Sequence, residues 1–372
     1  MNKRIVFTSN TSWYLYNFRS SSIRHLILSG YEVTCISPKD DYSEKLVKSL
    51  GCNWMNVKMN NKGRNPFEDI QLIYHFYKLI KSIGPSIVFN FTVKNNVYST
   101  AACGIIGIPV VNNISGLGTA FIERGLTSYI VSFLYRVTQP FASMVYCQNS
   151  EDLKLLTNHN LVNKSKLGLL PGSGVDTNRF RPVKRVPNEK FTFLFVGRML
   201  FDKGLRELIE ASRSLYECGY EFNLYFCGFR SSDNRSSVPS DIFDQWVNLP
   251  FVTYLGPTDE VDVVYGKADC VVLPSYREGL PRTLIESGSM GIPSITTNVP
   301  GCKHVVTDGF NGLVCNVKDV QSLSDCMTKI LTMDEKERTR LGVNARRRVK
   351  EKYDEQLVIS ELMENIEKFA IN

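Results

Sequence analysis

The segment LPSYREGLPRTLIESGSMG, residues 273–291, contains glutamates and glycines. It runs from the end of an expected strand through a loop into an expected helix. Backbone amides around Gly279 and Leu280, at the start of the helix, form an anion site. Glu278 and Glu286 would repel a diphosphate bound there, so they are better suited to accept hydrogen bonds from sugar hydroxyls. The alternative is that Glu278 only stabilises the helix N-terminus.

Two cations follow an earlier strand in the segment GRMLFDKG, residues 197–204. Gly197 lies at the strand end, and Arg198 and Lys203 are expected to project into the same crevice as the glutamates. Two fixed cations there would neutralise a diphosphate and stabilise the charge that develops as it leaves. The alternative is that both side chains are simply solvated.

The elements that must position these residues alternate between short apolar strands and helices through both halves of the chain. This alternation predicts parallel sheets that are covered by helices on both faces. In such doubly wound sheets, ligands bind at the carboxyl ends of the strands. The expected strands include 4–8, 32–37, 86–91, 191–196, 223–227 and 270–273, and the expected helices include 66–83, 205–217 and 335–350.

The length of 372 residues fits two domains of this kind. We expect a first domain at 1–170, a linker at 171–187 and a second domain at 188–351. Pro, Gly and Asn are concentrated in the linker, PGSGVDTNRFRPVKRVPN. A C-terminal helix within 352–372 is expected to pack back on the first domain.

Composition excludes several classes of protein. Hydrophobic residues make up 43% of the chain, which excludes disorder, and the formal charge of +7 is too small for a long nucleic-acid footprint. The ten cysteines and four histidines form no metal-binding pattern and no Asp-x-Asp occurs, so no metal site is predicted. Unpaired thiols suit a reducing cytosol. No signal peptide and no apolar run long enough to span a membrane is present, so a cytoplasmic protein is expected.

The combination of GRMLFDKG with EGLPRTLIE resembles the donor site of the family 4 retaining glycosyltransferases. PGSGVDTNRF is similar to the segment of that family at the domain junction, and NISGLGTAF and VPGCKHVVTDGFNGLV resemble a subgroup that builds bacterial capsules and O-antigens. The likeness extends over nearly the whole chain. It implies a GT-B fold, in which two doubly wound, Rossmann-like domains face each other across a cleft. It also implies that the N-terminal domain, 1–170, binds the acceptor and that the C-terminal domain, 188–351, binds the nucleotide sugar.

The resemblance also implies roles for the matching residues. Arg198 and Lys203 should bind the donor diphosphate, Glu278 should meet the hydroxyls of the transferred sugar, and Glu286 should accept the ribose hydroxyls. The SGLG loop should face the diphosphate from the first domain, through Gly116 and Gly118. Many family members have a histidine where this loop has Ser115, so the acceptor-side catalytic contact is unnamed.

The implied reaction is retaining and needs no metal or other cofactor. No enzymic nucleophile is evident, which suggests that the leaving diphosphate helps to deprotonate the incoming hydroxyl on the same face of the sugar. The two cations would replace the divalent ion that other transferases use.

The acceptor side is predicted less directly. Trp13, Asn17 and Arg19 follow the first strand, where an aromatic ring could stack on a sugar and Arg19 could meet a lipid diphosphate. The basic segment 58–94 carries aromatic residues at helical spacings, which favours contact with an anionic membrane surface. A second basic run, at 346–352, is expected to be a solvated helix face.

The reading that we favour is a hexosyltransferase that moves GalNAc from a UDP-sugar to GlcNAc or a short glycan on undecaprenyl diphosphate, at the inner face of the membrane, in O-antigen or capsule synthesis. One alternative is transfer of GlcNAc, Gal, Glc or FucNAc onto a longer lipid-linked glycan. The others are a UDP-sugar 2-epimerase and a non-catalytic sugar-binding subunit. The oligomeric state is not predicted.

Overall fold

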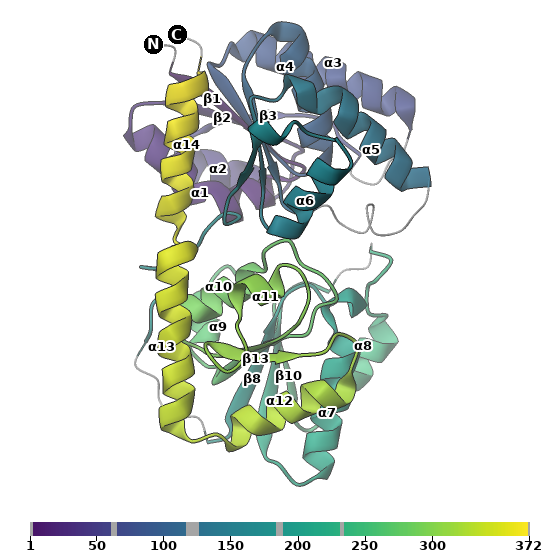
Figure 1. The fold of residues 1–372 in the computed structure, drawn as a ribbon, viewed down its shortest axis with the longest axis vertical. Helices are drawn as coiled ribbons and strands as arrows, with labels where there is room; N and C mark the ends of the chain where they lie inside the picture. The colour runs from purple at the N-terminus through teal and green to yellow at the C-terminus, as the bar shows by residue number, and fades with distance from the viewer. Residues whose placement is uncertain (1–2, 61–64, 117–125, 184–188, 231–233, 371–372) are drawn as a thin grey trace. The chain divides into compact units, whose positions relative to one another are not determined.

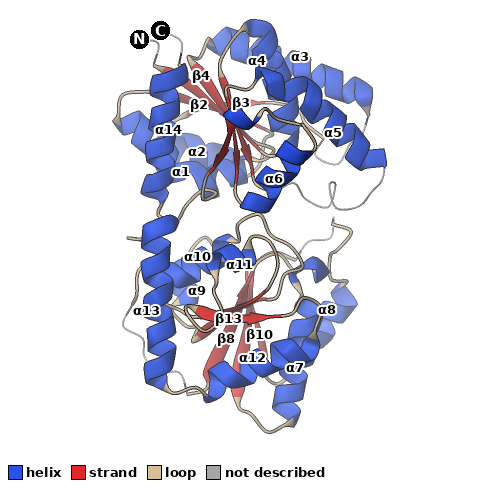
Figure 2. Ribbon diagram, in the orientation of Figure 1, coloured by secondary structure: helices blue, strands red, loops and turns tan. Residues whose placement is uncertain are grey.

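The structure is a computed structural model that describes residues 3–60, 65–116, 126–183, 189–230 and 234–370. The chain divides into two compact units, of which the first comprises 1–173 and 355–372 and the second 174–354. Each unit is built around one parallel sheet with helices on both faces (Figures 1 and 2).

The first sheet has seven parallel strands in the order β3-β2-β1-β4-β5-β6-β7. The strands are β1 (Arg4–Thr8), β2 (Glu32–Ser37), β3 (Asn53–Asn56), β4 (Ile87–Phe91), β5 (Val110–Ile114), β6 (Met144–Cys147) and β7 (Leu167–Leu169). Ile5 pairs with Ile87 and Phe7 with Phe89 in the centre of the sheet.

Side-chain alternation along β1 explains why both faces of this sheet are covered. Val6 and Val88 belong to the core under one helix layer, whereas Ile5 and Phe7 belong to the core under the other. The helices of this unit are α1 (Ser12–Leu28), α2 (Ser43–Leu50), α3 (Pro66–Ile83), α4 (Thr100–Ile106), α5 (Leu126–Thr138), α6 (Ser150–Asn158) and α14 (Glu355–Phe369), together with a π-helix η1 (Asn95–Ser99) and 3₁₀ turns η3 (Gln139–Phe141) and η4 (Lys164–Lys166).

The second sheet has six parallel strands in the order β10-β9-β8-β11-β12-β13. They are β8 (Phe191–Val196), β9 (Phe222–Cys227), β10 (Val252–Gly256), β11 (Cys270–Leu273), β12 (Ser294–Thr297) and β13 (Gly312–Cys315). The helices are α7 (Leu205–Glu217), α8 (Ser240–Val247), α9 (Val261–Tyr265), α10 (Arg282–Ser289), α11 (Cys302–Val305), α12 (Val320–Thr332) and α13 (Glu335–Lys352), with a 3₁₀ turn η5 (Phe201–Lys203).

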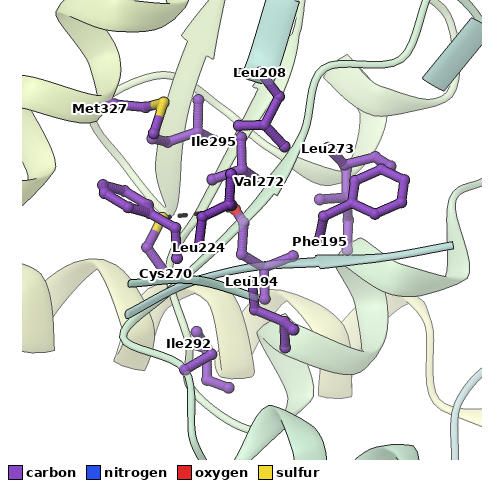
Figure 3. Close-up of a cluster of buried hydrophobic side chains, with 14 of the residues drawn as sticks. Leu194, Phe195, Leu208, Leu224, Cys270, Val272, Leu273, Ile292, Ile295 and Met327 are labelled. Carbon is purple, nitrogen blue, oxygen red and sulfur yellow. Dashed lines mark hydrogen bonds between the residues drawn. The ribbon is translucent and has the colours of Figure 1, made fainter. Parts of the chain in front are cut away.

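The core of the second unit lies against the central strands β8 and β11. Leu194 and Val272 lie in it with Leu224, Ile295 and other residues (Figure 3). Burial of each such aliphatic side chain contributes about 1.5–3 kcal/mol to stability. This packing holds the ends of β8 and β11 firmly in place, and the loops that follow these two strands carry the candidate site.

The boundary between the units, at 173/174, lies within the expected linker 171–187, but the rest of that segment belongs to the second unit. Val175 and Phe180 lie within 171–187 but are buried in the core of the second unit. The backbone N–H of Val175 donates to the carbonyl of Tyr353 over 2.9 Å, so the start of the second unit is fastened to the end of α13. Residues 184–188 of the expected linker lie outside the described residues.

The C-terminal helix α14 belongs to the first unit and packs on α1 (Figure 1). Val358, Leu362 and Ile366 are buried in the core that Ile5 and Phe7 share. Asn365 Nδ2 donates to the hydroxyl of Tyr146, on β6, over 2.8 Å. The helix therefore covers the first sheet with one apolar stripe at helical spacing.

The described helices include none that is both long and apolar enough to cross a membrane.

Candidate functional site

The candidate site of the second unit lies where the strand order reverses. β8 and β11 are neighbours, yet the chain leaves β8 toward β9 on one side and leaves β11 toward β12 on the other. The loops after such a pair diverge and leave a crevice at the carboxyl ends of the strands, which is where doubly wound sheets bind ligands. The two segments that carry Arg198, Lys203 and Glu278 are these two loops.

Two glycines bring the loops of this edge into backbone contact. Gly204 has a φ of +75°, and a Cβ there would lie 2.1 Å from the carbonyl oxygen of Pro274. Gly301 has a φ of +83°, and a Cβ there would lie 2.5 Å from the carbonyl oxygen of Glu278. Any other residue would push the loops apart. The glycines therefore set the spacing of the charged side chains beside them.

Lys203 and Glu278 form an ion pair, so the two loops converge as expected, although the pair itself was not predicted. The side chains are 22% and 13% exposed, so the pair is shielded from solvent but still reachable. Ser275 Oγ donates to the same carboxylate oxygen, Oε1, over 2.7 Å. The pair thus presents one cation and one acceptor-rich carboxylate side by side.

Glu286 is held by two donors within the same unit. Arg282 Nε lies 2.6 Å from Oε1 and the Tyr265 hydroxyl lies 3.0 Å from Oε2. Glu286 is only 7% exposed, and Tyr265 is fully buried. Burial, together with the neighbouring carboxylate, raises the pKa of Tyr265 well above its ordinary value, so the hydroxyl stays protonated and donates.

Arg198 differs from Lys203 in its surroundings. Its side chain is exposed, and within the described ranges no hydrogen bond or ion pair engages the guanidinium. Gly197, just before it, donates from its backbone N–H to the carbonyl of Cys227 over 2.9 Å. The cation is therefore carried on an anchored strand end with its head group in solvent.

The start of α10 provides amide donors. Gly279 and Leu280 are half-buried in the loop before this helix, and Pro281 at the N-cap supplies no side-chain hydrogen bond to the first turn. Backbone amides at a helix N-terminus attract anions. The helix start, Lys203 and Arg198 together can bind an anionic group, while the carboxylates can accept hydrogen bonds from hydroxyls.

Sequence reasoning missed two residues of this cluster, Tyr265 and Arg282. Arg282 stands four residues before Glu286, a spacing that brings two side chains together on one helix face and could have revealed the pair. Tyr265 comes from α9, a separate helix, and no local pattern links it to Glu286.

The predicted acceptor residues of the first unit lie on α1, which begins at Ser12. Thr11 caps the helix by accepting from the N–H of Tyr14 over 3.1 Å. Trp13 and Asn17 are half-buried, and Asn17 Nδ2 donates to the carbonyl of Trp13 over 3.0 Å.

Arg19 is placed differently from the prediction. It is only 3% exposed, its guanidinium lies 4.1 Å from the centre of the Phe91 ring, and Nη1 donates to the carbonyl of Gly172 over 3.3 Å. Contact with a lipid diphosphate would require this side chain to leave its packed position. The observed contacts instead fasten Gly172, near the end of the first segment of this unit, to α1.

The glycine loop of the first unit is only partly described. Gly116 has a φ of +126°, a backbone conformation that favours glycine, and Ser115 before it is exposed. Gly118 lies outside the described residues.

A cavity of about 520 Å³ opens beside α3 in the first unit. Lys58, His75 and Lys94 contribute cationic or titratable groups to its lining, and Asp69 pairs with Lys94 over 3.1 Å. Thr92, two residues before Lys94, has a φ of +74°, which is strained for a β-branched residue. The sequence analysis did not single out this cavity, because its lining comes from four separate segments.

The second basic run is not a solvated face throughout. Arg346 donates to the backbone carbonyls of Phe180, Ser289 and Thr177, and Arg348 donates to the carbonyl of His304 over 2.8 Å. Only part of the run, including Arg347, is exposed. The expectation was wrong for Arg346 and Arg348 because their helix, α13, packs on α10 and α11 instead of facing water on that side.

Among the residues that the structure describes, no three His, Cys, Asp or Glu side chains gather in a way that could hold a metal ion.

Comparisons with known proteins identify both units. Residues 4–149 match the family model "Glycosyl transferase 4-like", and residues 176–348 match the model "Glycosyl transferases group 1". The two matches correspond closely to the two sheets.

Curated relatives resemble the chain over most of its length. An N,N'-diacetylbacillosaminyl-diphospho-undecaprenol alpha-1,3-N-acetylgalactosaminyltransferase of Campylobacter jejuni is 26% identical, with 95% of this chain and 96% of the relative covered. A UDP-Gal:alpha-D-GlcNAc-diphosphoundecaprenol alpha-1,3-galactosyltransferase of Escherichia coli is 23% identical, with 76% and 75% covered.

Solved structures share the fold. A glycosyltransferase from Rickettsia africae superposes with a TM-score of 0.80 at 17% identity, covering 99% of this chain and 98% of its own. Anabaena HepE in complex with UDP-glucose gives a TM-score of 0.80 at 16% identity, covering 98% and 99%. The expected GT-B fold, with two Rossmann-like domains, is confirmed. Because both halves match glycosyltransferase family models and the relatives are similar over most of the chain, the chain belongs to the family 4 glycosyltransferases.

Proposed function

We propose that this glycosyltransferase transfers GalNAc from UDP-GalNAc to GlcNAc or a short glycan on undecaprenyl diphosphate, during synthesis of an O-antigen or capsule. The observation that carries the donor side is the ion pair of Lys203 with Glu278 beside the amides at the start of α10. A nucleotide sugar needs both kinds of group: cations and amides for its diphosphate, and a carboxylate for its sugar hydroxyls.

Relatives support the acceptor class more strongly than the sugar. The names of the Campylobacter jejuni and Escherichia coli relatives both contain a diphospho-undecaprenol acceptor, whereas the transferred sugars differ, N-acetylgalactosamine in one and galactose in the other. Galactose is therefore the second candidate for the transferred sugar. Anabaena HepE, whose fold is similar, is solved with UDP-glucose, which supports a uridine nucleotide.

The proposed reaction proceeds with retention and without a metal. The acceptor hydroxyl attacks the anomeric carbon while the bond from that carbon to the diphosphate oxygen breaks, and the proton of the hydroxyl passes to the departing diphosphate. Arg198 and Lys203 stabilise the negative charge on the departing UDP. Glu278 holds the sugar through its hydroxyls, and Glu286, oriented by Tyr265 and Arg282, accepts from the ribose.

On the acceptor side, we propose that Trp13 and Asn17 contribute from α1 and Gly116 from its loop. The protein would work at the cytoplasmic face of the membrane, where a polyprenyl diphosphate presents its glycan. An epimerase or a non-catalytic subunit needs no acceptor hydroxyl, and this difference is used in the test.

A transfer assay with a synthetic GlcNAc-diphosphate-lipid, in buffer with a metal chelator, tests the proposal. UDP-GalNAc, UDP-GlcNAc, UDP-Gal and UDP-Glc are offered separately, and the products are analysed by mass spectrometry and by NMR for the anomeric configuration. We expect the mass of one N-acetylhexosamine to be added from UDP-GalNAc, with an α linkage. Addition from UDP-Gal alone would show that the transferred sugar is galactose and not GalNAc. A change of the donor sugar without transfer would favour the epimerase, and donor binding without reaction would favour the subunit.

A further inference from the structure

An apolar outer surface distinguishes one helix layer of the first unit. Phe67, Ile70 and Tyr74 on α3, and Tyr129, Ile130 and Phe133 on α5, are between 50% and 77% exposed. The spacing of each set places it along one face of its helix. The opposite faces of the same helices pack on the sheet, through residues such as Phe76 on α3 and Tyr135 on α5. Helices that are apolar on both faces are unusual where the outer face meets water.

These residues belong to one continuous helix layer. α4 contacts α3 on one side and η3 on the other, and η3 contacts α5, in agreement with Figure 1, in which the three helices lie on the same side of the first sheet. α4 and η3 add Ile105 and Phe141, which are also exposed. Large exposed apolar patches on soluble domains mark interaction surfaces. We call this surface the α3–α5 face.

The charges of this face favour an anionic partner. Residues 100–106 and 126–141 contain no Asp or Glu, and Arg136 is exposed among them. Lys78 and Lys81 are exposed on the last turns of α3, and Lys166 donates to the carbonyls of Pro140 and Ala142 beside η3. Two acids stand at the other end of α3, and one of them, Asp69, is paired with Lys94.

We propose that the α3–α5 face docks the protein on an anionic lipid surface, with the α3 and α5 side chains inserted at the level of the head groups and the lysines and Arg136 among the phosphates. A second copy of the chain is a poorer occupant, because a two-fold contact would bring Lys78, Lys81 and Arg136 of one copy toward the same cations of the other. The proposal deepens the proposed function by giving the membrane contact a surface. The biological purpose of docking rests on the proposed function, but the binding to lipid does not. Vesicles that contain neither acceptor nor donor therefore test the binding by itself.

This surface differs from the one that the sequence indicated. The segment 58–94 was expected to carry the contact, and α3 does expose Phe67 and Tyr74, but Phe76 and Ile80 are buried. α5 and η3, which carry about half of the face, were not recognised.

Co-flotation of the purified protein with vesicles of phosphatidylglycerol and phosphatidylcholine tests the proposal. The double variant Ile130→Asp/Phe133→Asp places acids among anionic head groups and removes two inserted side chains. Each apolar side chain contributes more than about tenfold when buried, so we expect the vesicle affinity to fall at least about tenfold. Both positions are exposed, so the fold should tolerate the change, and circular dichroism and thermal unfolding verify this.

The matched control is Leu28→Asp/Val47→Asp, which removes exposed apolar side chains from the opposite helix layer. We expect this variant to bind vesicles as the wild type does. Replacing Lys78 and Lys81 by Gln, raising the salt concentration or using phosphatidylcholine alone should each weaken binding. Equal loss in both double variants, or binding indifferent to phosphatidylglycerol, would overturn the proposal.

Two further readouts separate insertion from other outcomes. Phe133→Trp should give a blue-shifted emission on addition of vesicles and should be quenched by brominated lipid; emission unchanged by vesicles that bind the protein would contradict insertion. If light scattering shows that Ile130→Asp/Phe133→Asp converts a dimer into a monomer while vesicle binding is unchanged, the face is a self-association surface and the proposal fails.

Transfer to a short-chain, water-soluble acceptor should be equal in both double variants and the wild type. If no transfer occurs even with the wild type, while the wild type still binds vesicles, the proposed function fails but the docking surface does not.

Discussion

Glu278 brings together the two segments that the sequence singled out. Its oxygen Oε1 accepts from Ser275 and meets Lys203, so one carboxylate is shared between its own loop and the loop after β8. Residue types and their place after two strands were sufficient to predict this convergence, because the carboxyl ends of neighbouring parallel strands meet at one edge. The burial of Arg19 could not be predicted, since it depends on Phe91 and Gly172, which are distant in sequence.

Loss of the cation should reduce transfer more than it reduces stability. For Lys203→Ala we expect transfer to fall about 10²–10³-fold, as it does when one donor to a developing oxyanion is removed. Lys190→Ala is the matched control, because Lys190 is half exposed and pairs with the exposed Glu221. Steady-state kinetics of both variants measure this effect. Equal transfer rates for Lys203→Ala and the wild type would show that Lys203 does not contribute to the reaction.

Tyr265 should act by positioning Glu286. Tyr265→Phe removes the donor to Oε2 in a buried site, which costs about 1–3 kcal/mol of interaction. We expect a higher KM for the nucleotide sugar with a smaller change in kcat, since the proposed contact of Glu286 is with the ribose and not with the reacting carbon. Tyr216→Phe, at an exposed tyrosine of α7, is the control and should leave KM unchanged. A Tyr265→Phe enzyme with wild-type KM would argue against this role.

At the scale of elements, α10 is anchored at its C-terminal end. Its start carries the amide site, and at its end Ser289 receives a hydrogen bond from Arg346 on α13, which also donates to Phe180 over 3.2 Å. The elements around the site were predictable because strands of continuous apolar residues and glycine-ended helices have strong local signatures. The role of α13 was not, because a run of basic residues has the same sequence pattern whether it faces water or backbone carbonyls.

Replacement of Arg346 tests this arrangement of elements. Arg346→Met leaves buried carbonyl groups without their donor, so we expect the free energy of unfolding to fall by about 1–3 kcal/mol and the KM for the nucleotide sugar to rise as α10 loosens. Arg347→Met, one residue along on the exposed side, should change neither quantity. Denaturant titration and donor kinetics measure both effects. Identical stability of the two variants would return Arg346 to the solvated face that its sequence suggested.

At the scale of the whole molecule, buried thiols make the free energy of unfolding depend on pH in the alkaline range. Burial raises the pKa of Cys103 in the first unit and of Cys302 in the second to about 12, from an ordinary value of 9.0. Below pH 9.0 these thiols are protonated in both the folded and the unfolded chain. Above it, the unfolded chain releases protons that the folded chain retains, so the free energy of unfolding falls as the pH rises toward 12.

We therefore expect each such thiol to contribute a slope of about 1.4 kcal/mol per pH unit in this window. Denaturant unfolding at a series of pH values measures the slope. Cys103→Ala should flatten it, whereas Cys218→Ala, at an exposed cysteine, should not. The scattered cysteines indicated unpaired thiols from the sequence alone, but which of them are buried is known only from the three-dimensional structure.

We propose that the loops after β8 and β11 hold the diphosphate of a uridine nucleotide sugar. Calorimetric titration of UDP into the wild type and four variants tests this directly. We expect Arg198→Ala and Lys203→Ala each to weaken UDP binding about tenfold or more, in keeping with the loss of a charge-assisted hydrogen bond. Lys190→Ala and Arg347→Met should bind UDP as the wild type does. Undiminished UDP affinity in both Arg198→Ala and Lys203→Ala would contradict this placement of the diphosphate.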